Sequence, residues 1–207
     1  MRRRTLLIGS GIAVLLGLVL WQLGRPPQVR NYPSTGETLI ALGDSLTAGD
    51  GVASAETYVA VLSARLGVSI VNAGVSGDTT AGALVRLPAL FGQYPRPKLV
   101  IVMLGGNDFL QRRPKEETAQ NLGRIIEAFQ ARGAVVVLVG VRGGVFSDEF
   151  ASEYKRLARQ YQTAYVPNVL KGIIGDPSLK VDTIHPNAKG YQKIADRLEK
   201  VIRPLLK

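Results

Sequence analysis

Short apolar runs alternate with helix-period segments along most of the chain. In the segment 114–132, Leu122, Ile125, Ile126 and Phe129 recur at i, i+3, i+4 and i+7, which is typical of an amphipathic helix. The same analysis predicts strands at 38–43, 68–72, 98–104, 134–140 and 164–167, and helices near 55–66, 79–91, 114–132, 148–162 and 187–203. This alternation predicts an α/β fold.

Two of the predicted strands are apolar at every position. Residues 99–104 and 134–139 contain no polar side chain, whereas a strand with one wet face alternates between apolar and polar residues. Both faces of the sheet should therefore be covered by helices. We predict a three-layer α/β/α fold with a five-stranded parallel sheet, whose ligands bind beyond the carboxyl ends of the strands.

Three of the predicted strands run into turns rich in glycine and polar residues. The turns are G-D-S-L at 43–46, N-A-G-V-S-G-D at 72–78 and G-G-N-D at 105–108. Any one of them is an ordinary turn sequence. Since the carboxyl ends of parallel strands meet at one edge, three such turns together indicate a functional site there.

The chain contains one histidine, His185, just before the last predicted helix. Asp182 lies three residues upstream, and in a turn this spacing can bring its carboxylate to Nδ1 of the imidazole. Nε2 would then be free to act as a base. A lone histidine is more often structural, but this pairing favours catalysis.

A serine hydroxyl becomes a useful nucleophile when such a base accepts its proton. Ser45 is the best-placed candidate because it follows the first strand and precedes a helix, so that its backbone N–H would face a developing oxyanion. Ser76 in the second turn, and Thr79 and Thr80 directly after it, remain competitors on position alone.

The usual G-x-S-x-G signature of α/β-hydrolases is absent. The three turns and D-T-I-H-P-N at 182–187 instead resemble, in order and spacing, the four sequence blocks of the GDSL or SGNH hydrolases. The resemblance covers residues 37–207. The string R-L-P-A-L at 86–90 is similar to the branch that contains thioesterase I, lysophospholipases and arylesterases.

The resemblance implies the flavodoxin-like SGNH hydrolase fold and a catalytic triad. Ser45 would be the nucleophile, His185 the general base and then the acid, and Asp182 the residue that orients His185. Thr183 departs from the pattern, because this branch often has glycine at that position. A small polar residue there should leave the triad intact.

The same resemblance implies an oxyanion hole and a substrate contact. The oxyanion hole would consist of the backbone N–H groups of Ser45 and Gly77 and the side-chain amide of Asn107. Phe109 and Leu110 begin a segment where relatives carry a substrate loop, so we expect them to contact substrate. Asp44, Asp78 and Asp108 are interpreted as turn and cap residues.

The N-terminus is strongly apolar. Arg2, Arg3 and Arg4 precede an uncharged stretch, 5–24, whose roughly 20 residues span about 30 Å as a helix. Because it is longer than the apolar core of a usual signal peptide and ends in Trp21-Gln22-Leu23-Gly24 without an A-x-A pattern, an uncleaved transmembrane anchor is favoured over a signal helix. We divide the chain into this segment at 1–24, a linker at 25–36 and a hydrolase domain at 37–207. With the anchor in the membrane, the hydrolase domain would lie outside the cytoplasm on the periplasmic side. If the segment is cleaved, the domain would be secreted.

Charge and composition exclude some functions and leave others open. The net charge is +10, but residues 1–30 contain five arginines and no acid, and no basic run with interleaved aromatics follows, so no nucleic-acid partner is expected. The absence of cysteine excludes a thiol nucleophile and a thiolate metal site. An oxygen-rich Mg²⁺ site of a phosphoesterase stays open, since Asp44, Asn107, Asp108, Asp182 and His185 could cluster.

These observations predict a serine hydrolase, a monomer without cofactor or metal, that cleaves small acyl or aryl esters, thioesters or lysophospholipids. Removal of acetyl groups from cell-envelope polysaccharide is the main alternative. A tethered binding module without catalysis is another.

Overall fold

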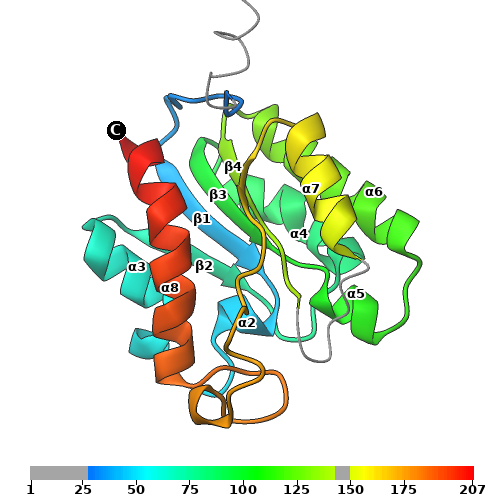
Figure 1. The fold of residues 1–207 in the computed structure, drawn as a ribbon. Helices are drawn as coiled ribbons and strands as arrows, with labels where there is room; N and C mark the ends of the chain where they lie inside the picture. Colours follow the sequence, from blue (N-terminus) through cyan, green and yellow to red (C-terminus); the bar gives the residue numbers. More distant parts are fainter. Residues whose placement is uncertain (1–27, 143–149) are drawn as a thin grey trace, which may run out of the picture.

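A five-stranded parallel sheet forms the centre of the computed structural model, which describes residues 28–142 and 150–207 (Figure 1). The strand order is β2-β1-β3-β4-β5 and every neighbouring pair is parallel. The strands are β1 (Thr38–Gly43), β2 (Ile70–Gly74), β3 (Pro97–Met103), β4 (Val135–Val139) and β5 (Ala164–Val166). The predicted α/β fold with a five-stranded parallel sheet is confirmed.

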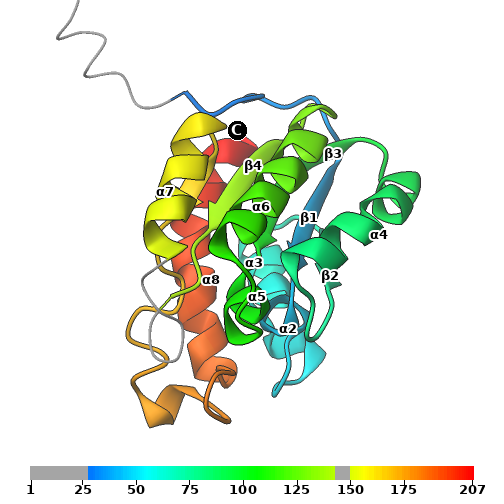
Figure 2. The ribbon, with the colours of Figure 1, turned by 90° about the vertical axis from the view of Figure 1, so that its right-hand side faces the viewer.

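Helices cover both faces of the sheet (Figures 1 and 2). Successive residues of β1 divide between two cores, since Leu39 and Ala41 pack on one side and Ile40 and Leu42 on the other. The first core is closed by α3 (Tyr58–Leu66) and α8 (Ala188–Ile202), and the second by α4 (Thr80–Gln93), α6 (Lys115–Gln130) and α7 (Ala151–Gln160). This arrangement explains the strands that are apolar at every position.

Several short helices were not predicted. They are α2 (Ser45–Ala48), α5 (Gly106–Leu110) and the 3₁₀ turns Ser54–Glu56, Pro177–Leu179 and Arg203–Leu206. The predicted helix 55–66 is divided, because Thr57 has extended backbone and its hydroxyl accepts from Ala60 N at 3.2 Å as the N-cap of α3.

The second strand lies two residues later than predicted, at 70–74 instead of 68–72. Its polar end belongs to the sheet because Ala73 and Gly74 pair with the end of β1, and the Asn72 amide donates to Thr47 O at 2.8 Å. Gly74 is required by space, since a Cβ there would lie 2.1 Å from Ala48 N.

The segment that leads into β1 crosses the amino ends of the strands and is held there by hydrogen bonds. Arg30 N donates to Gln162 O at 2.8 Å, while the side chains of Asn31 and Ser34 donate to carbonyls between the end of α6 and the start of β4. We call residues 30–34 the entry strap. The predicted segment 1–24 lies outside the described residues, and within 28–142 and 150–207 no helix has the length and apolarity to span a bilayer.

Candidate active site

The three turns singled out in the sequence meet at the carboxyl ends of β1, β2 and β3. Figures 1 and 2 show α2 and α5, which begin in the first and third turns, at this edge. The loop before α8 reaches the same edge, because His185 contacts Ser45 across 140 positions of sequence.

The turn that carries Ser45 is tight and buried. Ser45 is the first residue of α2, and the Asp44 carboxylate caps this helix by accepting from Leu46 N at 3.0 Å. Gly43 leaves room for the turn, since a Cβ there would approach the Thr47 hydroxyl to 2.0 Å. Ser45 is therefore held by β1 on one side and by the capped helix on the other.

The loop that carries His185 is held by bonds within itself. An antiparallel bridge joins Lys180 and Pro186, and Val181 N donates to His185 O at 3.0 Å. Oδ1 of Asp182 accepts from the backbone N–H groups of Ile184 and His185, each at 2.8 Å. The three-residue spacing thus folds the aspartate back onto its own histidine.

Asp182, His185 and Ser45 form a continuous hydrogen-bonded relay. Oδ2 of Asp182 lies 2.7 Å from Nδ1 of His185, and Nε2 of His185 lies 3.0 Å from Oγ of Ser45. Since an ionised carboxylate can only accept, Nδ1 carries the proton and Nε2 accepts from the serine hydroxyl. The hydrogen bond from His185, with those of the two backbone N–H groups, lowers the pKa of Asp182 to about 2.

The competing hydroxyl groups are bonded elsewhere. Ser76 donates to Asp50, Thr79 caps α4 by accepting from Gly82 N, and Thr80 donates to Asp108. Within the described residues, Ser45 is the hydroxyl bonded to His185.

Asp44 differs from the other carboxylates of the site. It is 2% exposed, and burial raises its pKa to about 7, with the nearby charge of Asp78 acting in the same direction and that of His185 in the opposite one. Its cap role agrees with the interpretation from sequence.

Arg86 connects two of the turns and was not recognised as a site residue. Its Nε donates to Asp78 at 2.8 Å, and its Nη2 donates to Gly43 O at 3.1 Å. The string R-L-P-A-L contains the signal, because it places a cation two helical turns after Asp78. Asp78 is thus an ion-pair partner, and Asp108 accepts from Thr80 N at 2.9 Å, so both carboxylates hold turns together.

The predicted oxyanion donors differ in how close they lie to the pocket beside Ser45. Asn107 lines the same pocket as Ser45 and His185, and its Nδ2 donates to Asp78 O at 2.9 Å, which leaves its second N–H for another acceptor. Gly77 has a φ of +77°, is exposed, and lies outside the lining of that pocket. Among the described residues, no hydrogen bond occupies the N–H of Ser45 or of Gly77.

The pocket beside Ser45 is small, about 10 Å³, which is room for roughly one water molecule. Leu46, Leu110 and Ile184 form its apolar walls, and Ile184 was missed although it precedes His185 directly. Leu110 also lines a neighbouring hollow of about 650 Å³ with Phe109 and Phe150, whose rings meet edge to face with centroids 6.0 Å apart.

The carboxylates considered for a magnesium site are engaged in other bonds. Asp44 and Asp108 accept from backbone N–H groups of different helices, and Asp182 is bonded to His185. In the part of the chain that the structure describes, no three His, Cys, Asp or Glu side chains are grouped as a metal would require.

Comparison with known proteins gives a consistent result. The profile of the GDSL-like lipase/acylhydrolase family matches residues 41–193. The esterase TesA of Pseudomonas aeruginosa is 35% identical over 184 residues, which cover 84% of this chain and 91% of that protein. The thioesterase 1/protease 1/lysophospholipase L1 of Escherichia coli is 34% identical over 181 residues, which cover 84% and 86%.

Solved structures are similar over nearly the same range. The crystal structure of TesA is 35% identical and superposes with a TM-score of 0.77 over 82% of this chain and all of that one. The psychrotrophic esterase EstA from Pseudoalteromonas sp., in a structure inhibited by monoethylphosphonate, is 30% identical with a TM-score of 0.74 over 82% of this chain and 98% of that one.

Proposed function

Because the chain belongs to the GDSL-like lipase/acylhydrolase family, we propose that it hydrolyses carboxylic esters and thioesters through an acyl-enzyme on Ser45. The observation that carries the proposal is the relay from Asp182 through His185 to Ser45, with heavy-atom separations of 2.7 and 3.0 Å. The related esterases, thioesterase and arylesterase support the same chemistry.

In the first half-reaction, Oγ of Ser45 attacks the substrate carbonyl carbon while Nε2 of His185 takes the hydroxyl proton. The carbonyl oxygen becomes an oxyanion. The imidazolium then gives its proton to the leaving alcohol or thiol, the bond from the carbonyl carbon to that group breaks, and the acyl group remains on Ser45. A water molecule repeats the sequence and releases the acid. Asp182, ionised because its pKa is about 2, holds the tautomer throughout.

The oxyanion would be bound by Ser45 N–H, Gly77 N–H and the free N–H of Asn107. Support comes from the unoccupied backbone donors and from the hydrogen bond between Asn107 and Asp78 O, which fixes the carboxamide beside Ser45. Donors fixed before the reaction stabilise the developing charge without reorganisation.

Substrate contacts are proposed for Phe109 and Leu110. Leu110 lines both the small pocket and the larger hollow, so an acyl chain could continue from Ser45 over Leu110 towards Phe109. This path suits small acyl esters, thioesters and lysophospholipids. The enzyme would act as a monomer and without a cofactor.

A second candidate function is the removal of acetyl groups from cell-envelope polysaccharide. The tightness of the pocket beside Ser45 favours it, because a short acyl group needs less room there than a long one. Hydrolysis rates for p-nitrophenyl esters of increasing chain length, beside an acetylated glycan, distinguish the two functions.

We also propose that residues 1–24 anchor the protein in a membrane, with 25–36 as the linker and 37–207 as the catalytic domain outside the cytoplasm. The support is the uncharged stretch 5–24 behind three arginines. Retention in the pellet after alkaline carbonate extraction would agree with an anchor, and a mature N-terminus near residue 25 would contradict it.

The decisive experiment for the proposed chemistry is Ser45→Ala. We expect kcat for p-nitrophenyl acetate to fall on the order of 10⁴-fold or more, with an unchanged circular dichroism spectrum, because no other hydroxyl is bonded to His185 within the described residues. The matched control is Ser76→Ala, which removes a hydroxyl from the neighbouring turn. Undiminished turnover in Ser45→Ala would contradict the mechanism.

A further inference from the structure

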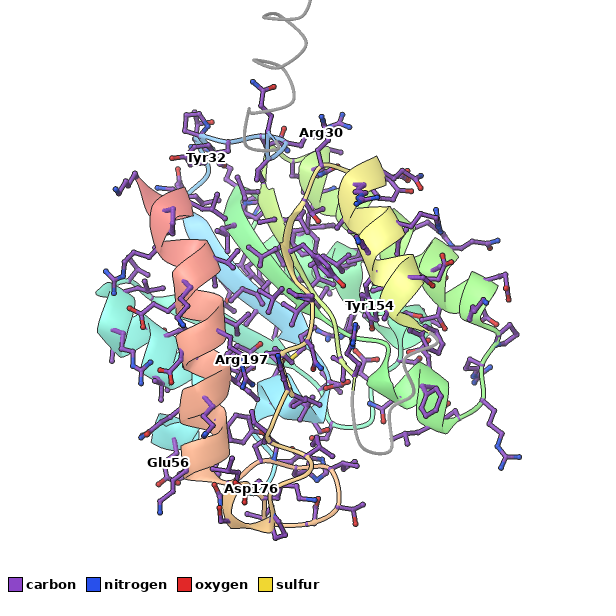
Figure 3. All side chains as sticks on the ribbon, viewed as in Figure 1. Arg30, Tyr32, Glu56, Tyr154, Asp176 and Arg197 are labelled. Carbon is purple, nitrogen blue, oxygen red and sulfur yellow. The ribbon has the colours of Figure 1, made fainter. Side chains whose placement is uncertain are left out.

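The chain enters the described body at the end opposite the candidate active site. Figure 3 shows Arg30 and Tyr32 at one end of the molecule and Glu56 and Asp176 at the other. Ser45 follows the carboxyl end of β1, whereas the entry strap crosses the amino ends of the strands. Hydrogen bonds of Arg30, Asn31 and Ser34 fix this exit point on the body.

The connection between the apolar stretch and the body is short. Gly24 ends the uncharged run and Arg30 is bonded to the body through Gln162 O, so the six peptide units between them reach at most about 22 Å. Helix α8, with 15 residues, runs between the two ends and is about 22 Å long. If residues 1–24 lie in a bilayer, the strap end is held near its surface and the catalytic pocket stands about 20 Å further away.

The strap end is also the basic end of the body. The C-termini of the helices and the amino ends of the strands meet there, and they present the exposed or half-exposed cations Arg30, Lys98, Arg132, Arg159, Lys200 and Lys207. The carboxylates of this end are Glu37, Glu127, Asp196 and Glu199, of which Glu37 pairs with Arg96, Asp196 with Arg65 and Glu199 with Arg203. Among the described residues, no carboxylate pairs with Lys98, Arg159, Lys200 or Lys207.

The catalytic end carries charges of both signs. Asp50, Glu116, Glu117, Asp176 and Asp182 lie there together with Arg112, Arg113, Lys115, Lys180, Lys189 and Lys193. Cations near an anionic bilayer are attracted over a distance of one Debye length, about 8 Å at physiological ionic strength. The strap end therefore has an excess of cations to present to a membrane, whereas the charges of the catalytic end are mixed.

From the exit point, the short connection and this charge difference, we infer that the strap end docks on anionic phospholipid head groups and turns the catalytic pocket away from the anchoring membrane. The inference rests on the proposed anchor and hydrolase function. In this orientation the enzyme would act on soluble, monomeric esters or thioesters that arrive from the aqueous phase. It would not act on the phospholipids of the bilayer that holds the protein.

Helix α8 offers a matched pair of probe positions. The chain has no cysteine, so Lys200→Cys and Lys189→Cys each create a single labelling site. Both lysines are exposed, and they lie about 16 Å apart along the helix, Lys200 towards the strap end and Lys189 towards the catalytic end.

The full chain, labelled with a fluorophore, is reconstituted in liposomes of phosphatidylcholine with or without phosphatidylglycerol and a head-group quencher. We expect at least two-fold stronger quenching at position 200 than at 189 in the anionic liposomes, and a loss of that difference at high salt. Quenching that is equal at both positions, or stronger at 189, or independent of phosphatidylglycerol, would overturn the inference.

Charge reversal supplies the second measurement. Lys98→Glu with Lys207→Glu, placed in the Lys200→Cys chain, should reduce its quenching to the level in phosphatidylcholine alone. The control, Lys193→Glu with Lys180→Glu, changes the charge equally at the catalytic end and should leave quenching unchanged. Equal effects of the two pairs would overturn the inference.

Turnover of p-nitrophenyl acetate in the same liposomes shows whether docking, the proposed function or the anchor is wrong. A chain that hydrolyses the ester but shows the wrong quenching pattern contradicts docking alone. A chain without turnover contradicts the proposed function. A chain that carbonate extracts from the liposomes contradicts the anchor, and the docking inference with it.

Discussion

The turn between β1 and α2 and the loop at 180–187 each bring one aspartate close to Ser45, and the two aspartates have opposite properties. Asp44 is 2% exposed, and burial raises its pKa to about 7. The Asp182 side chain is 51% exposed, and its bonds to His185 and two backbone N–H groups lower its pKa to about 2. Residue type alone therefore does not identify the partner of a catalytic histidine.

The two pKa values differ because the two carboxylates differ in their exposure to water and in the hydrogen bonds that they accept. Asp182 keeps water on one side and accepts three hydrogen bonds, so its ionised form is favoured. Asp44 accepts from Leu46 N but is removed from water, so its ionised form is costly. The exposed aspartate is thus suited to hold a positively charged imidazole, and the buried one to shape the turn that carries Ser45.

Of the two aspartates, Asp182 should cause the larger loss of activity when it is replaced by asparagine. This variant keeps the side-chain shape but can present an amide N–H to Nδ1, which favours the wrong tautomer of His185. We expect kcat to fall about 10³-fold, less than the roughly 10⁴-fold known for a buried triad aspartate, because water reaches this site. Steady-state kinetics with a p-nitrophenyl ester measures it.

The same assay with Asp44→Asn tests whether the two aspartates have different roles. Asparagine retains the cap on Leu46 N, so the loss of kcat should stay below about ten-fold. A loss as large as that of Asp182→Asn would mean that Asp44, and not Asp182, supplies the carboxylate that the mechanism needs.

The stability of Asp44→Asn should depend on pH differently from that of the wild type. In the wild type, the folded pKa of about 7 exceeds the unfolded value of 3.8, so the folded state binds more protons and stability falls as the pH rises from about 4 to 7. The variant lacks this slope. Its free energy of unfolding relative to wild type should rise by up to about 4 kcal/mol between pH 4 and pH 8. Urea unfolding at both pH values measures it, and a difference that does not change with pH contradicts the burial argument.

The smallest effect, of opposite sign, is expected for the stability of Asp182→Asn. The folded pKa of Asp182 lies below its unfolded value, so its contribution to stability is present above pH 4 and lost as the pH falls through about 2. Because the side chain is half exposed, the difference from wild type at pH 7 should be about 1 kcal/mol or less. Urea titrations at pH 7 and pH 2.5 should show it shrinking with acid; a difference that grows would contradict the assignment.

Much of the fold could be predicted because its signals are long or strongly apolar. The strand 38–43 was predicted with its observed bounds, and the helices that begin near 80, 115 and 188 were found within one or two residues. The short helices α2 and α5 were interpreted as turns, since four or five residues do not show a helical period. The shift of β2 depends on pairing with β1, which no local pattern reveals.

Some features of the candidate site could also be predicted from the sequence, and others could not. The closeness of Asp182 and His185 follows from a spacing of three in one turn, so the sequence could indicate it. The burial of Asp44 and the bridge from Arg86 to Asp78 and Gly43 arise from segments far apart in the chain. Such features depend on tertiary packing and required the structure.

The contact between Ser45 and His185 has a consequence for biosynthesis. The two residues are 140 positions apart, so at 5–20 residues per second a ribosome adds the histidine on the order of ten seconds after the serine. Until the last loop and α8 have been made and folded onto the sheet, the hydroxyl has no base. The growing or unfolded chain is therefore inert towards esters, and hydrolysis begins only once the whole domain has closed.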